Sequence, residues 1–214
     1  MLAALVMLKK VPEFADKKFV LPINSMLYKA YWPGAKMMDI TFVPVHSPQV
    51  RKKHAQYKEN MKSRELTLMD RITVPKEDYL DVEASLQRYL EESKKALEAG
   101  GIVIVAPQAQ GNMDKIDITH QRKAFSKFRN YMAQYPGLDY SVLPIGVSYP
   151  RSAAEGRPQK GGHFGEKMRI EIGGCYDREK VTQAVSLAGG NADLWMYWQI
   201  ASLLPKEAVK RPAQ

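Results

Sequence analysis

The fold is decided by the stretch Gly100-Gly101-Ile102-Val103-Ile104-Val105-Ala106-Pro107-Gln108-Ala109-Gln110-Gly111-Asn112, which runs from a helix end through an apolar strand into a polar loop. Every side chain from 102 to 106 is apolar and either small or β-branched, so both faces of this strand need cover. The pattern predicts a central strand in a sheet flanked by helices. Pro107 has no amide donor and ends the strand. The polar residues after it then lie at the carboxyl edge of the sheet, where open α/β sheets bind ligands; an ordinary turn is the alternative.

A helix leads into this strand. Between Asp81 and Ala99 apolar residues recur at helical spacing, and Gly100 stands where a left-handed cap is expected. The residues predicted to form the buried stripe of this helix are Val82, Leu86, Leu90 and Leu97.

Further outward, the same patterns predict an alternation of helices and strands. Before the central stretch we expect a helix over 2–8, a strand over 18–22, a helix over 25–32 and a strand over 39–45, where Pro44 favours an edge position. After it we expect a helix from Thr119 to about Gln134, strands over 141–147 and 168–173, and helices over 177–187 and 192–204. This order predicts a single α/β domain over residues 1–214 with a mostly parallel central sheet flanked by helices.

Composition narrows the classes of partner without choosing one. The chain has 214 residues, 45% of them hydrophobic, and a formal net charge of +9, which suits a buried core and favours anionic partners. Its one cysteine, Cys175, excludes an intramolecular disulfide and every multi-cysteine zinc pattern, so we expect a packing role for it and no metal site. The apolar run over 1–8 is shorter than the roughly 20 residues that a membrane-spanning helix needs.

Basic residues gather between Ser47 and Arg71, within what we interpret as a charged insertion at about 47–75. Such a run is either a solvated helix face or a flap that meets anionic lipid or a phosphorylated substrate.

Several features together resemble the glycerolipid acyltransferase family, whose lysophosphatidate-type members transfer an acyl group from acyl-CoA or acyl carrier protein to a lysophospholipid. Residues 105–112 are similar in position to the family's third block, a strand that ends in Phe-Pro-Glu-Gly-Thr-Arg. Residues 142–147 resemble its fourth block, an apolar strand with an internal proline, and residues 165–173 resemble a later strand that ends in glycine. Residues 200–205 are similar to a helix end in some bacterial members. The resemblance implies an acyltransferase-like α/β fold, a role in phospholipid biosynthesis, and a cytoplasmic location peripheral to the membrane. It implies no cofactor beyond the acyl thioester co-substrate.

The same resemblance suggests which residues bind substrate. These are Pro107, Gln108, Ala109, Gln110, Gly111 and Asn112, with Pro144 from the fourth block and Arg71 in place of the second-block arginine. The segment Phe42-Val43-Pro44-Val45 competes for the second block but has no arginine. Where the family has glutamate and arginine, this chain has Gln108 and Gly111, and a neutral amide cannot make arginine's bidentate phosphate contact. Lys115, Arg122 or the basic cluster at 51–53 must then supply the charge.

The family's catalytic element, His-x-x-x-x-Asp, is not found in this chain. None of the four histidines precedes an aspartate at that spacing. His54 with Glu59 comes near to the pattern, but both residues belong to the charged segment. The simpler interpretation is that this is an accidental spacing of two surface residues. We therefore expect that the chain begins just after the catalytic element and is an incomplete or inactive acyltransferase as given. The alternative function is a non-catalytic basic module that binds anionic lipid or nucleic acid, although only net charge favours nucleic acid.

Overall fold

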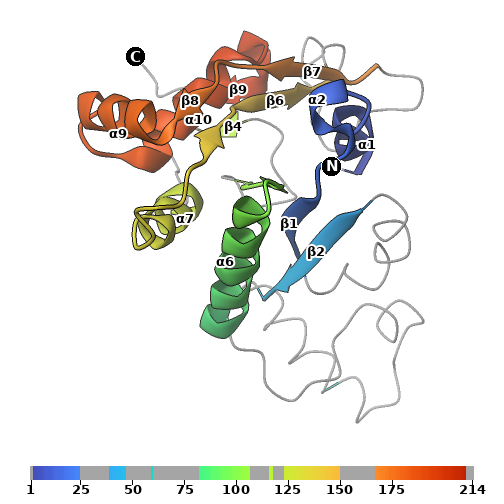
Figure 1. Ribbon diagram of the computed structural model, residues 1–214. Coiled ribbons are helices and arrows are strands. Elements are labelled where there is room, and N and C mark those ends of the chain that lie inside the picture. The colour runs from blue at the N-terminus through green and yellow to red at the C-terminus, as the bar shows by residue number, and fades with distance from the viewer. Residues whose placement is uncertain are drawn as a thin grey trace. The chain divides into compact units, whose positions relative to one another are not determined.

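The computed structural model describes residues 2–24, 39–46, 59, 82–106, 116–117, 123–149 and 167–210. These residues form two compact units, which we describe separately (Figure 1). Pro12–Ile104 make up the parallel-sheet unit, and Met1–Val11 with Val105–Gln214 make up the carboxyl-terminal unit. The prediction of a single domain over the whole chain stays a prediction.

The parallel-sheet unit is built on three strands and a long helix. Its elements are α2 (Pro12–Ala15), β1 (Phe19–Asn24), β2 (Ile40–Val45), α6 (Val82–Glu98) and β3 (Ile102–Val103). All three strands are parallel, in the order β2-β1-β3, and Phe19 pairs with both Ile40 and Ile102. The predicted parallel sheet with helical cover is therefore confirmed for this unit, as is the edge position expected from Pro44.

The prediction that residues 102–106 form the central strand is wrong for the residues that the structure describes. β1 lies in the middle, because the consecutive side chains of Phe19, Val20 and Leu21 are all buried and so both of its faces are covered. β3 is a two-residue edge strand whose side chains are half-buried. It ends well before Pro107, since its pairing with β1 covers only Phe19 and Val20, followed by one hydrogen bond from Ile104 N to Val20 O (2.8 Å).

Helix α6 ends as its sequence predicts. Gly100 has a φ of +69°, the left-handed conformation that glycine adopts without strain, and Gly101 N then donates to Ala96 O (2.8 Å). The predicted buried stripe is only partly correct, because Leu90 alone of its four residues is buried. The buried residues of α6 are Ser85, Tyr89, Leu90, Ser93 and Ala96.

The carboxyl-terminal unit contains short strands in pairs. Its elements are α1 (Leu2–Leu8), β4 (Ile116–Asp117), α7 (Ala124–Met132), β5 (Ser141–Val142), β6 (Ile145–Ser148), β7 (Arg169–Ile172), β8 (Tyr176–Asp177), α9 (Arg178–Leu187), α10 (Ala192–Ser202), a 3₁₀ turn (Lys206–Ala208) and β9 (Val209–Lys210). β4 and β9 are parallel, but β5 pairs antiparallel with β8, and β6 pairs antiparallel with β7. The strands predicted at 141–147 and 168–173 exist, the first divided at Leu143 and Pro144, yet in the described residues they form antiparallel pairs rather than part of a parallel sheet.

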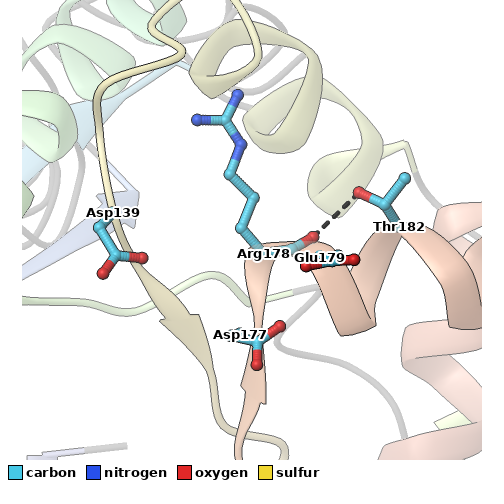
Figure 2. Close-up of a pocket in the computed structure, with 5 residues that line it drawn as sticks. All are labelled: Asp139, Asp177, Arg178, Glu179 and Thr182. Atoms are coloured by element: carbon cyan, nitrogen blue, oxygen red, sulfur yellow. Dashed lines mark hydrogen bonds between the residues drawn. The ribbon is translucent and has the colours of Figure 1, made fainter.

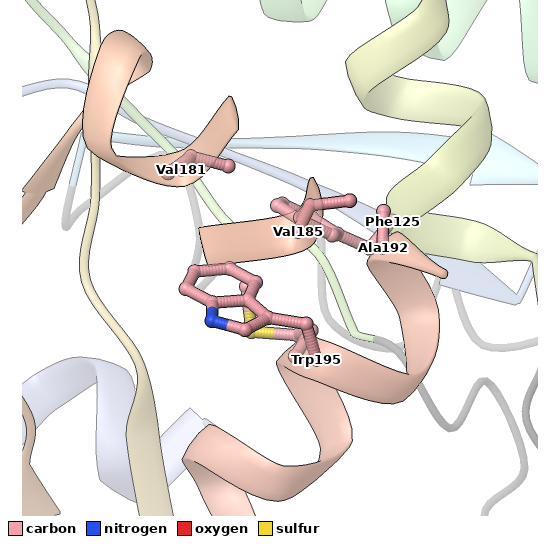
Figure 3. Close-up of a cluster of buried hydrophobic side chains, with 6 residues drawn as sticks. Phe125, Val181, Val185, Ala192 and Trp195 are labelled. Carbon is pink, nitrogen blue, oxygen red and sulfur yellow. The ribbon is translucent and has the colours of Figure 1, made fainter. Parts of the chain in front are cut away.

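The core of this unit is an apolar cluster from three helices. Figure 3 shows Trp195 of α10 with Val181 and Val185 of α9 and Phe125 of α7; Ala192 and Met196 complete the buried set. The ring of Trp195 lies 5.9 Å from that of Phe125 and 5.3 Å from that of Tyr176, the latter edge to face. On α10, Trp195 is 5% exposed, whereas Trp198 is 46% exposed.

A buried carboxylate joins α7 to α10. Asp193, which is 4% exposed, accepts hydrogen bonds from Phe125 N (2.9 Å), Ser126 N (3.1 Å) and Ser126 Oγ. The predicted helix from Thr119 to Gln134 thus begins later, at Ala124, and its first turn is capped by a residue distant in sequence. Thr119 itself lies outside the described residues.

The remaining expectations have mixed outcomes. The predicted helices at 2–8, 177–187 and 192–204 are confirmed, with Asp177 and Asn191 as N-caps of α9 and α10. Cys175 is exposed, so the prediction that it packs in the core is wrong; it lies in the short connection before β8. The predicted helix at 25–32 and, apart from Glu59, the charged segment 47–71 lie outside the described residues. No helix in the described part of the chain is long and apolar enough to cross a membrane.

Candidate ligand-binding edge of the parallel sheet

β1 and β2 end level with each other at one edge of the parallel-sheet unit, and β3 runs toward the same edge but ends opposite Val20, four residues before the end of β1. Asn24, the last residue of β1, pairs with Val45, the last residue of β2, and His46 follows directly. On the other side of β1 the chain leaves β3 at Val103 and continues through Ile104. This is the edge at which parallel α/β sheets bind ligands. We call it the ligand edge.

Helix α6 fixes the chain where it leaves β2. Ser85 Oγ accepts a hydrogen bond from His46 N (3.1 Å) and donates one to Val82 O (2.8 Å). The hydroxyl of Ser85 is therefore used in both directions, and the first peptide beyond β2 is tied to the first turn of α6. His46 is half-buried.

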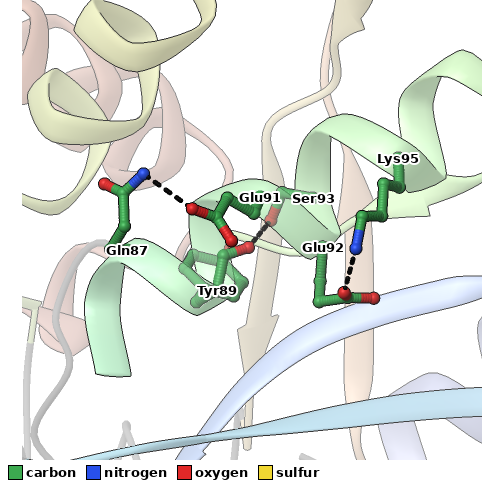
Figure 4. Close-up of polar contacts among 6 residues, drawn as sticks. All are labelled: Gln87, Tyr89, Glu91, Glu92, Ser93 and Lys95. Carbon is green, nitrogen blue, oxygen red and sulfur yellow. Dashed lines mark hydrogen bonds and ion pairs between the residues drawn. The ribbon is translucent and has the colours of Figure 1, made fainter. Parts of the chain in front are cut away.

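One helical turn further on, α6 also fixes the chain beyond β3. Tyr89 OH donates to Ile104 O (2.9 Å), and Ser93 Oγ donates to Tyr89 O (2.7 Å; Figure 4). Burial raises the pKa of the Tyr89 phenol well above its usual value of 10.0, so it stays protonated and remains a donor at any physiological pH. Both hydrogen-bonding groups of Ile104 are then satisfied, the N–H by Val20 and the C=O by Tyr89.

The outer face of α6 is polar and solvated. Figure 4 shows Gln87 donating to Glu91 (3.0 Å) and Lys95 donating to Glu92 (2.8 Å). The hydrogen bond from Lys95 to Glu92 raises the pKa of Lys95. Contacts of this kind at exposed positions add little to stability. The polar groups of α6 that fix neighbouring segments are therefore its buried hydroxyls.

Most of the site predicted from the sequence lies outside the described residues. This holds for Pro107, Gln108, Ala109, Gln110, Gly111 and Asn112, for Arg71 and His54, and for Lys115, Arg122 and the cluster at 51–53. Glu59 is described as an exposed helical residue. Pro144 is buried between β5 and β6, where its carbonyl accepts a hydrogen bond from Gly173 N (2.9 Å). The roles assigned to these residues stay predictions.

A hollow lies in the carboxyl-terminal unit. It is open, has a volume of about 490 Å³, and is lined by Asp139, Asp177, Arg178, Glu179 and Thr182 (Figure 2). Arg178 Nη1 donates to the carbonyls of Tyr135 (2.8 Å), Leu138 (3.1 Å) and, more weakly, Pro136 (3.3 Å), so it closes the turn after α7.

Asp177, one of the acidic residues that line this hollow, also holds the start of α9. Asp177 accepts from Lys180 N (2.8 Å) at the start of α9 and pairs with Lys180 Nζ (2.9 Å). These hydrogen bonds lower the pKa of Asp177 and raise that of Lys180. We therefore interpret the hollow as a structural junction. In the described part of the chain, no group of three histidine, cysteine or acidic side chains is arranged to hold a metal ion.

Sequence reasoning missed the hydroxyl groups of α6. Ser85, Tyr89 and Ser93 recur every fourth residue and therefore lie on one face of a helix, a signal that is present in the sequence. The aliphatic side chains of Val82 and Leu86 favour a different stripe, because aliphatic residues at helical spacing are the usual signal of a buried helix face.

Comparisons with protein-family models, with curated proteins and with solved structures found no match to this chain. The resemblance to glycerolipid acyltransferases thus rests on the sequence features alone.

Proposed function

We propose that this chain is an acyltransferase-like domain that binds an acyl thioester and a lysophospholipid at the ligand edge. The observation that carries the proposal is the parallel pairing of β1 with β2 and β3, because it directs the carboxyl ends of all three strands toward one edge, where β1 and β2 end level with each other. The polar segment Pro107–Asn112 follows β3 in the sequence after only three further residues, Ile104, Val105 and Ala106. Its amides are suited to hydrogen bonds with a substrate headgroup.

Acyl transfer requires a general base and hydrogen-bond donors that stabilise an oxyanion. In acyl transfer the acceptor hydroxyl oxygen attacks the thioester carbonyl, a C–O bond forms, the C–S bond breaks, and the thiol leaves. A base takes the hydroxyl proton, and hydrogen-bond donors stabilise the oxyanion. The sequence has no His-x-x-x-x-Asp element to supply the base. We therefore expect the chain to bind the substrates, and we test turnover separately from binding.

The first experiment measures binding by the purified chain. We expect saturable binding of a thioether analogue of long-chain acyl-CoA, and this binding should persist with lysophospholipid present below its micellar concentration, because both substrates must be bound together for acyl transfer. Substituting Gln108→Ala or Gln110→Ala should weaken it, while Gln183→Ala, on the outer face of α9, should leave it unchanged. Binding that does not saturate, or that the Gln108 and Gln110 substitutions do not affect, would contradict the proposal.

The second experiment measures turnover, with the diacyl product detected by mass. If thiol release is measured instead, Cys175→Ala is needed, because the exposed Cys175 thiol would react with the reagent. Salt-sensitive binding to anionic vesicles or nucleic acid without binding of the thioether analogue would favour the alternative, a non-catalytic basic module.

A further inference from the structure

We draw no further inference here: the strongest candidate, the apolar face of the antiparallel β6–β7 pair on which Val147 and Ile172 are exposed, carries none, because nothing in the described part of the chain shows what covers it.

Discussion

Removing the carboxylate of Asp193 should destabilise the carboxyl-terminal unit by an amount that its contacts predict. Asp193→Ala leaves the buried amide of Phe125 and the partly buried amide of Ser126, both in the first turn of α7, without their acceptor. An unsatisfied buried donor costs about 1–3 kcal/mol, and relaxation toward water recovers part of this, so we expect a total of about 3 kcal/mol. Asp193→Asn keeps one acceptor oxygen but loses the charge that favours a helix N-terminus, so about 1 kcal/mol is expected.

Urea unfolding followed by far-UV circular dichroism and tryptophan fluorescence measures these changes. Ser126→Ala removes only the side-chain contact to Asp193 and should cost less than Asp193→Ala. Glu179→Ala, at an exposed acidic position on α9, is the control and should stay within about 0.5 kcal/mol. The reasoning is refuted if Asp193→Ala costs no more than Glu179→Ala, or if the alanine and asparagine variants are equally stable.

Three further predictions test other features. Gly101→Ala should lower the free energy of unfolding by about 1–3 kcal/mol, because a Cβ there would stand 2.9 Å from Lys18 O and 3.0 Å from Ala96 O. The control in the same thermal melt is Gly137→Ala, because a Cβ at Gly137 would meet nothing within 4 Å. Arg178→Lys should cost about 1–2 kcal/mol, because the guanidinium that reaches three carbonyls is lost, whereas the exposed Arg88→Lys should change little in urea unfolding. Asp177 has a lowered pKa, so its contribution to stability is present above its ordinary value of 3.8 and is lost as the pH falls through the lower folded value. The melting temperature of Asp177→Asn should therefore lie below that of the unmodified chain at pH 7 and converge with it near pH 2; a constant difference would contradict this.

Local signals in the sequence predicted local structure well. The length of α6 and the left-handed Gly100 depend on residues within a few positions of one another, and both are confirmed. The helix predicted from residue 177 is confirmed as well, and the Asp177 side chain that caps it accepts from an amide only three residues further on.

Features that depend on distant residues were not predicted. β1 rather than residues 102–106 lies in the middle of the sheet, because the order of strands follows from tertiary packing and the two apolar runs look alike in sequence. The first turn of α7 is held by Asp193, 68 residues beyond Phe125, so the local pattern places the start of this helix too early, at Thr119. The bond from Tyr89 to Ile104 likewise joins residues that no local pattern relates.

The two indoles of α10 provide an intrinsic optical reporter. Trp195 is enclosed between helices while Trp198, less than one turn away, meets solvent, so a soluble quencher such as iodide reaches one chromophore and spares the other. In a variant that carries Trp32→Phe, which removes the third indole of the chain, a shift in the quenched fraction would reveal loosening of this helix without any attached dye.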